Sequence, residues 1–481
     1  MLHAPRRSKL EQFPVALLIA ATVIVFGAVG SNIFLTIFAF VELLVGVWLL
    51  QRPGESPILL LIFCFQWLQA STKIFYANWQ GVSVETLTPT GDVETAIVLS
   101  LCAVIALALG LRLGAGKTNP TMGEFVFSVS QRRSPKDWFY LYVPILIVTS
   151  IAQNFAWVVP GLTQPILAVA NIKWAFYWML TYATFANAGA SRRYWYVAFC
   201  IELLLSLGTY FADFKTVFLF TLLGMLAVPV RWSLTRYASV TAFAVLLVLY
   251  AWVWTAIKEE YRFFVNGGGF DQVVTMGFGD RITKLVELTT QLDSQKLDVA
   301  VESLVNRVAY VDLFAVIVQQ VPAVIPHEDG AVWWDAITRV FMPRLLFPDK
   351  PGIDDSIRAN LFGLDVSGRE EGTSIGIGYI AETYIDFGKV TMMLVIFSFG
   401  IVLGRIYHWL LFKPPYRGFL GMALATNLLY SILLVEVSIT KLIGGLVITL
   451  LASWLTARVL VPMFAPWLSA APDTISAGAR S

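Results

Sequence analysis

The sequence predicts an all-α polytopic membrane protein with about twelve transmembrane helices. Three observations support this fold class. First, 57% of the 481 residues are hydrophobic and only 14% are charged, whereas a soluble domain carries about 25% charged residues. Second, apolar runs long enough to cross a bilayer, which takes about 20 residues, recur along the chain. Third, the lysines and arginines gather in alternate loops.

The apolar runs define the order of the elements. Nine helices are predicted before residue 258 and three after residue 388, which divides the chain into a helical part at 1–257, a large loop at 258–388, a second helical part at 389–465 and a tail at 466–481. The predicted helices cover residues 14–30, 32–50, 57–76, 94–113, 138–156, 166–187, 193–210, 214–230, 236–257, 389–410, 417–436 and 439–463.

The bias of basic residues between the loops predicts the orientation. The N-terminal segment and the short loops on its side hold half of the lysines and arginines, and short loops on the opposite side hold almost none. Because cytoplasmic loops carry this excess, both termini are expected in the cytoplasm and the large loop outside it. We therefore predict a multi-pass protein of a bacterial inner membrane with a periplasmic loop at 258–388.

The large loop is predicted to be folded and helical. It holds 20 of the 32 acidic residues and 11 of the 34 basic ones. Apolar residues recur at helical spacing after Asp280 and from about residue 295 to 321. Tryptophans and arginines between Trp333 and Leu346 are typical of a helix that lies in the lipid headgroup region. Asp354 is expected to cap a further short helix.

Four lysines fall in the outer halves of predicted transmembrane helices, where an ionisable side chain is costly. Each could simply extend to the interface, but four together indicate an anion site in the outer leaflet. Lys215 is the strongest candidate because it begins a helix, where the helix dipole also favours a phosphate. Glu202 could form a structural ion pair with Lys173. The four are Lys73, Lys173, Lys215 and Lys441.

The stretch from residue 339 to 388 is the richest in chemistry. Its arginines and lysines lie at separate turns and could clamp a pyrophosphate, since arginine makes bidentate contacts with such groups. Glu382 and Asp386 are four residues apart, so both carboxylates share one face of a helix. A carboxylate at the membrane surface could act as general base toward a sugar hydroxyl. The plainer interpretation is a solvated charged loop.

Several functional classes find no support in the sequence. The three cysteines lie inside apolar runs and the three histidines are far apart, so neither a disulfide framework nor a metal cluster is predicted. No Walker A motif indicates a nucleotide, and no basic aromatic patch indicates nucleic acid. We expect no cofactor. His327 is more typical of a turn than of a catalyst.

Three segments resemble the O-antigen polymerases, the Wzy-type polymerases of oligosaccharide repeat units. Asp213-Phe214-Lys215 is similar to the start of a late helix in that family. Met342 to Pro351 looks like its Pro-Arg…Pro-x-Lys-Pro segment. The run from Ser374 through Glu382 to Gly388 looks like its Glu-x-Tyr-x-Asn-Phe-Gly, although Asp386 stands where the family has asparagine.

The resemblance implies a GT-C type glycosyltransferase that joins repeat units carried on undecaprenyl pyrophosphate, without metal or nucleotide sugar. It also implies contact with membrane lipid and a possible chain-length-regulating copolymerase as partner. With this mechanism, Glu382 is the first choice of general base, with Asp386 or Glu371 behind it. The expected ligands of the pyrophosphate are Lys215, Arg344, Lys350, Arg369 and Arg358.

Two other functions stay open at the level of sequence. An O-antigen ligase, which moves finished glycan to another acceptor, shares this layout. A transporter or flippase of lipid-linked oligosaccharide would carry out no chemistry. Transporters tend to show two equivalent halves with broken helices, and the division into nine and three predicted helices argues against that.

Overall fold

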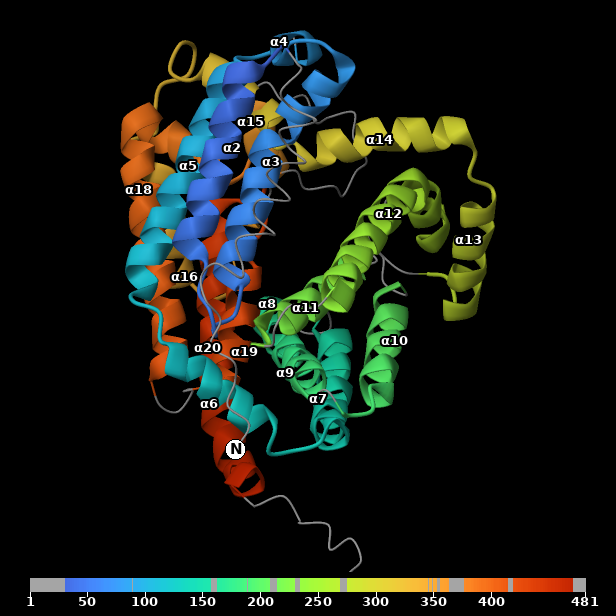
Figure 1. Cartoon of the computed structure of the whole chain (residues 1–481). Helices are drawn as coiled ribbons and strands as arrows, with labels where there is room; N and C mark the ends of the chain where they lie inside the picture. Colours follow the sequence, from blue (N-terminus) through green and yellow to red (C-terminus); the bar gives the residue numbers. More distant parts are fainter. Residues whose placement is uncertain are drawn as a thin grey trace, which may run out of the picture.

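The computed structural model describes residues 31–88, 90–156, 162–187, 189–207, 214–229, 234–268, 275–344, 346–347, 349–352, 355–362, 376–413 and 418–469. Every regular element in these ranges is a helix (Figure 1). The predicted helix at 14–30 lies outside the described residues. The helices in the first half are α2 (Ile33–Leu50), α3 (Ile58–Gln80), α4 (Val84–Leu87), α5 (Val93–Ala115), α6 (Pro120–Ser130), α7 (Pro135–Phe155), α8 (Thr163–Ala170), α9 (Lys173–Ala186), α10 (Arg193–Leu207), α11 (Phe214–Ala227) and α12 (Leu234–Val265).

In its described residues, the predicted large loop contains five complete helices, and three more helices follow them. The loop helices are α13 (Phe278–Thr290), α14 (Ser294–Val308), α15 (Val311–Gln320), α16 (Ala331–Val340) and α17 (Asp355–Leu361). They are followed by α18 (Tyr379–Phe412), α19 (Phe419–Tyr430) and α20 (Ile439–Ser469). In Figure 1, α13 and α14 pack on α12 as an arm beside the main bundle. The helical nature predicted for this loop is thus confirmed.

Six of the described helices are long and apolar enough to cross a membrane. They are α2, α3, α5, Val240–Val265 of α12, α18 and Ile439–Val459 of α20. These helices make the chain a multi-pass helical membrane protein. The predicted count of twelve is not confirmed by the described residues: α19 has 12 residues, too few for a full crossing, and the span predicted at 14–30 lies outside them.

One predicted helix is broken in two. The apolar run at 166–187 forms α8 and α9, with a turn at Asn171 and Ile172 between them. There the amides of Trp174 and Ala175 bond to the carbonyls of Asn171 and Ile172, three residues back, instead of four. Such bonds tighten a turn and end the regular α-helix.

Helices α5 and α18 cross in close contact through glycines. A Cβ added at Gly110 would lie 2.1 Å from the carbonyl oxygen of Phe397, and one at Gly114 would lie 2.2 Å from that of Ile401. Gly400 and Gly404 face them from α18. Residue numbers rise together on both helices, so the two run parallel. Glycines spaced four apart allow backbones to approach in this way inside a membrane.

Helix α18 doubles back on itself at Gly388. This glycine has φ 68° and ψ −174°, outside the helical region. The rings of Tyr379 and Phe399 are 6.3 Å apart, whereas residues twenty apart in a straight helix would be separated by about 30 Å. The segment 379–387 is therefore a short helix packed beside the long one, and it begins inside the bundle.

The chain between α19 and α20 is irregular and buried against α3. Gln66 of α3 donates its amide to the carbonyl of Ile432 at 2.7 Å, and Gln69 accepts from the amide of Val435 at 3.0 Å. Tyr379 donates its hydroxyl to Gln66 at 2.7 Å. The predicted helix at 417–436 is therefore wrong beyond Tyr430. Irregular backbone at membrane depth needs such partners, or a water-filled cavity beside it.

Candidate functional site

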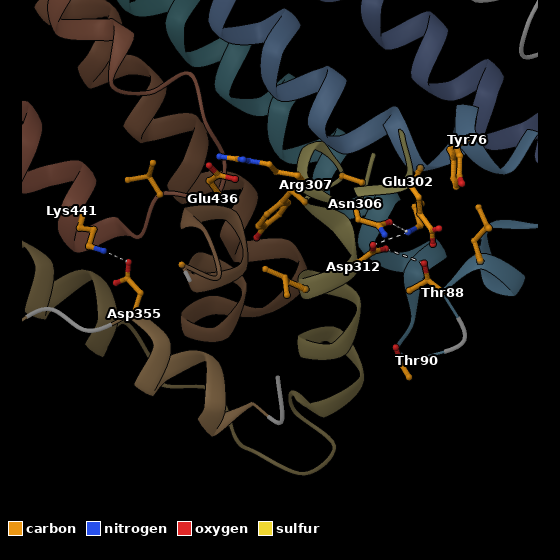
Figure 2. Close-up of a pocket in the computed structure, with 17 residues that line it drawn as sticks. Tyr76, Thr88, Thr90, Glu302, Asn306, Arg307, Asp312, Asp355, Glu436 and Lys441 are labelled. Carbon is orange, nitrogen blue, oxygen red and sulfur yellow. Dashed lines mark hydrogen bonds and ion pairs between the residues drawn. The ribbon is translucent and has the colours of Figure 1, made fainter. Parts of the chain in front are cut away.

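A cleft of about 630 Å³ opens where the irregular segments meet the loop helices. Its walls come from α3, α14, α15, α17 and α20, together with Leu87, Thr88, Thr90, Gly376 and residues 436–437. Figure 2 shows the cleft as elongated, with Lys441 and Asp355 at one end and Tyr76 at the other. Since α4 and α14 lie at the same end of the molecule in Figure 1, the cleft belongs to the end that the charge bias predicts to be outside.

The lining of the cleft is strongly charged. It contains three cationic side chains, Lys73, Arg307 and Lys441, and four carboxylates on Glu302, Asp312, Asp355 and Glu436. Opposite charges from five different helices and a loop are thus gathered around one cavity. Such a lining suits a polar ligand that carries both hydroxyl groups and charge.

One end of the cleft is a preformed network around Lys73. The ammonium of Lys73 donates to Asp312 at 2.7 Å and to the side-chain oxygen of Asn306 at 3.2 Å. Thr88 donates its hydroxyl to the other carboxylate oxygen of Asp312 at 3.0 Å. Lys73 is buried, so this ion pair compensates the cost of placing its charge inside the bundle.

The other end is built on α17 and the first turn of α20. The ammonium of Lys441 lies 2.6 Å from the Asp355 carboxylate, as Figure 2 shows. Gly376 passes directly under this pair, where an added Cβ would lie 2.4 Å from the carbonyl oxygen of Glu436. Only glycine fits there without moving the backbone that carries Glu436.

Three charged side chains between these ends have no hydrogen bond or ion pair within the described part of the chain. They are the exposed groups of Glu302, Arg307 and Glu436. Arg307 and Glu436 lie in the middle of the cleft in Figure 2. Because no neighbour satisfies them, these groups are available to a ligand.

Glu382, the predicted general base, lies behind the cleft instead of lining it. The side chain is 3% exposed, and its carboxylate accepts the amide of Ile439 at 2.6 Å. Ile439 is the first residue of α20, so Glu382 caps that helix. Its other oxygen is 3.9 Å from Nε of Arg358. A catalytic role for Glu382 stays a prediction.

Asp386 caps a different helix. Its two carboxylate oxygens accept the amides of Val332 and Trp333, at 3.1 and 2.9 Å, in the first turn of α16. The predicted shared face of Glu382 and Asp386 is present, and both carboxylates are used to hold the starts of other helices. A carboxylate in this position is favoured by the helix dipole.

The four predicted pyrophosphate ligands that the structure describes, Lys215, Arg344, Lys350 and Arg358, do not line the cleft. Arg358 donates to both carboxylate oxygens of Glu328 at 2.8 Å. Lys350 donates to the carbonyls of Arg339 and Met342 at 2.6 and 2.9 Å, which closes the turn after α16. Burial, and then repulsion by Arg339 and Arg344, lowers the pKa of Lys350. Arg344 is exposed on the same turn, 3.5 Å from the carbonyl of Pro351.

The remaining predicted residues are placed as follows. Lys215 is exposed in the first turn of α11, next to Thr216, whose hydroxyl lies 2.9 Å from that of Tyr430. Arg369 and Glu371 lie outside the described residues. The predicted pair of Lys173 and Glu202 is confirmed at 2.7 Å. Lys73 and Lys441, two of the four lysines noted in predicted spans, are the ones that reach the cleft.

Sequence reasoning missed Arg307, Asp312 and the two glutamines that hold the irregular segment. The glutamines had a usable signal. Gln66, Gln69 and Lys73 recur at positions i, i+3 and i+7, which places one polar stripe along a helix that is otherwise apolar. Arg307 gave no such signal, because an arginine in a charged amphipathic helix is ordinary.

No metal centre is indicated in the part of the chain that the structure describes. Histidine, cysteine, aspartate and glutamate nowhere form a group of three or more there that could hold an ion. The carboxylates of the cleft are instead interleaved with cations.

Residues 56–461 match a protein-family model, described as Domain of unknown function (DUF8712). The chain belongs to this family. No curated protein and no solved structure matches the chain. The family description assigns no activity, so the function has to be argued from the cleft.

Proposed function

We propose that the protein is a glycosyltransferase that joins oligosaccharide repeat units carried on undecaprenyl pyrophosphate, at the periplasmic face of the inner membrane. The observation that carries this proposal is the cleft, which combines an unpaired arginine with accessible carboxylates at one end of a membrane bundle. The resemblance of three segments to the O-antigen polymerases supports it further.

The donor sugar in such a reaction is already activated. The bond between its anomeric carbon and the pyrophosphate oxygen breaks, and the pyrophosphate leaves with the electron pair. The acceptor hydroxyl oxygen forms the new bond, and its proton passes to a carboxylate. The protein must therefore bind a leaving anion and hold one carboxylate beside the acceptor.

The cleft offers a residue for each task. Arg307 would bind the pyrophosphate, since a guanidinium makes charge-assisted and bidentate bonds to phosphate oxygens, while Lys441 lies at one end of the same cleft. Glu436 would accept the proton, because it is exposed and unpaired within the described residues. The Lys73 network, with Asn306 and Thr88, would present donors and acceptors to sugar hydroxyls.

The test uses cells that lack the protein, complemented with wild type, Arg307→Ala or Lys296→Ala. Both substitutions remove an exposed cation from α14, but Lys296 pairs with Glu260 at 2.8 Å and does not line the cleft. We expect long surface glycan with wild type and Lys296→Ala. Arg307→Ala should leave single repeat units on the lipid carrier, because losing one preorganised contact of this kind costs about 10²–10³ in rate.

The other outcomes separate the alternatives. Normal glycan chain length with Arg307→Ala would contradict the proposal that the cleft is the active site. Long but unattached glycan in cells without the protein would indicate a ligase. Normal, attached glycan in those cells would remove both transferase functions for this polysaccharide.

A further inference from the structure

A second cavity lies on the bilayer side of the molecule. It is a groove of about 500 Å³ between α18 and α20, and Trp333 of α16 also lines it. Both walls are helices long and apolar enough to span the membrane. Leu394 and Val402 on its rim are 64% and 55% exposed. The groove therefore opens sideways onto lipid, not onto water.

The polar groups that line the groove already have hydrogen-bond partners within the protein. Ser398 is the single polar residue of the lining, and its hydroxyl already donates to the carbonyl of Leu394 at 2.7 Å. Trp333 donates its ring N–H to the hydroxyl of Thr383 at 3.1 Å and packs edge-on against Phe399. The groove is thus preformed and apolar, and only a hydrocarbon would fill it favourably.

The groove is separate from the charged cleft. Lys441 lines the cleft, whereas Ile443 and Leu446 line the groove. At 3.6 residues per turn, Ile443 and Leu446 point about 200° and 140° away from Lys441 around α20. The two cavities lie on opposite faces of that helix. A chain seated in the groove would have its headgroup on the wrong side of α20 for the cleft.

The length of the groove matches one leaflet. Its lining on α18 runs from Leu394 to Ile406, which is about 18 Å of helix. Half of the hydrocarbon core of a bilayer is about 15 Å thick. An acyl chain of a bilayer phospholipid spans that distance.

We infer that this groove is a binding site for an acyl chain of a resident phospholipid, distinct from the substrate cleft. The lipid fills the space between α18 and α20, which touch each other little along this stretch, and it holds them at a fixed separation. The inference does not depend on the proposed enzymatic function.

The experiment measures lipid retained by the purified full-length protein, by native mass spectrometry after detergent washing. Ser398→Phe fills the groove, and Val390→Phe places the same ring on the exposed surface of the same helix outside the groove. We expect wild type and Val390→Phe to retain one phospholipid more than Ser398→Phe. Equal retention in all three proteins, or a polyprenyl phosphate as the retained species, would overturn the inference.

A measurement on wild type alone covers the case in which Ser398→Phe does not fold. The protein is reconstituted in vesicles containing a phospholipid with a diazirine in its acyl chain, irradiated and digested. Crosslinks should concentrate on residues 394–406 and 443–447. Crosslinks spread evenly to other exposed apolar positions, such as Phe34 and Ile37 of α2, would show bulk lipid contact and no site.

Discussion

The carboxylate of Asp386 shows how one side chain links two parts of the molecule. It accepts two backbone amides from the first turn of α16, so the segment before Gly388 fixes the start of a helix more than fifty residues away. The O-antigen polymerases have asparagine at the position that Asp386 resembles. An asparagine side-chain oxygen can also accept an amide hydrogen bond.

Asp386→Asn should therefore destabilise the protein less than Asp386→Ala does, because asparagine keeps one of the two acceptor oxygens. The alanine variant leaves two amides of α16 without their acceptor, at a cost of about 1–3 kcal/mol for each buried group left unpaired. Thermal unfolding in detergent would measure the difference. Equal melting temperatures for the two variants would contradict the capping role.

Glu382 allows a sharper comparison, because its predicted catalytic role and its observed capping role differ in one respect. Glutamine keeps an oxygen that can accept the amide of Ile439 but cannot take up a proton. If the role is structural, Glu382→Gln should retain activity within about tenfold, while a lost general base costs about 10²–10⁴.

The readout for Glu382 is glycan chain length in complemented cells, with Glu382→Ala as the matched loss of both functions. A Glu382→Gln protein that is folded and inactive would indicate that Glu382, and not Glu436, is the general base. The sequence spacing of Glu382 and Asp386 correctly predicted a shared helix face. It could not predict that two helix starts cover that face.

At the scale of elements, the crossing of α5 and α18 depends on glycine. The Cβ of an alanine at Gly110 would overlap the Phe397 carbonyl at 2.1 Å, and backbone atoms cannot rotate aside as side chains can. The two helices would have to separate along their parallel contact. The same packing positions the segment 379–387, which carries Glu382 and Asp386.

Gly110→Ala should lower the melting temperature, with a loss of about 1–3 kcal/mol expected for overpacking. Gly444→Ala in α20 is the control, since an added Cβ there meets no atom within 4 Å. That variant should be neutral or slightly stabilising, because alanine favours helix over glycine. A stable Gly110→Ala protein would mean that this contact is looser than the structure describes.

Helix boundaries were predictable where lipid-facing hydropathy sets them, and not where tertiary contacts do. The predicted helix at 32–50 corresponds closely to α2, and that at 94–113 to α5. The run at 417–436 is also apolar, but its last part leaves the helix, and Gln66 and Gln69 of α3 supply hydrogen bonds to it there. Hydropathy cannot predict that side chains of another helix replace the backbone hydrogen bonds of an α-helix.

At the scale of the whole molecule, the orientation is the property most open to a direct test. Glu85 of α4 and Lys117 between α5 and α6 are both exposed, and α4 and α6 lie toward opposite ends of α5 (Figure 1). The positive-inside rule predicts Glu85 in the periplasm and Lys117 in the cytoplasm. Both positions can carry a single cysteine in a background where Cys64, Cys102 and Cys200 are replaced.

A membrane-impermeant maleimide should label Glu85→Cys in cells with a permeable outer membrane. Lys117→Cys should react only after the inner membrane is also opened. The reverse pattern would place the charged cleft in the cytoplasm, where it could not act on periplasmic glycan. Labelling of both positions in sealed cells would indicate a leaky preparation, which a cytoplasmic marker enzyme detects.

The amino-acid sequence alone is enough to predict that much of this protein's surface faces lipid. Composition, apolar runs and the distribution of basic residues predict a helical membrane protein. Each of these properties is summed over many residues, so a wrong helix boundary changes the prediction little. Lys73 and Lys441 could also be singled out, since a charge in a transmembrane helix is costly wherever its neighbours lie.

The position of the candidate site depends on how distant helices pack, and it is visible only in the tertiary structure. The cleft brings together residues that lie far apart in the sequence, namely Lys73, the pair Arg307 and Asp312, and Lys441. The tertiary structure also decided that Glu382 and Asp386 face helix starts, while Glu436 faces open space. Which side chains meet depends on the packing of distant helices, and no local pattern of residues carries that information.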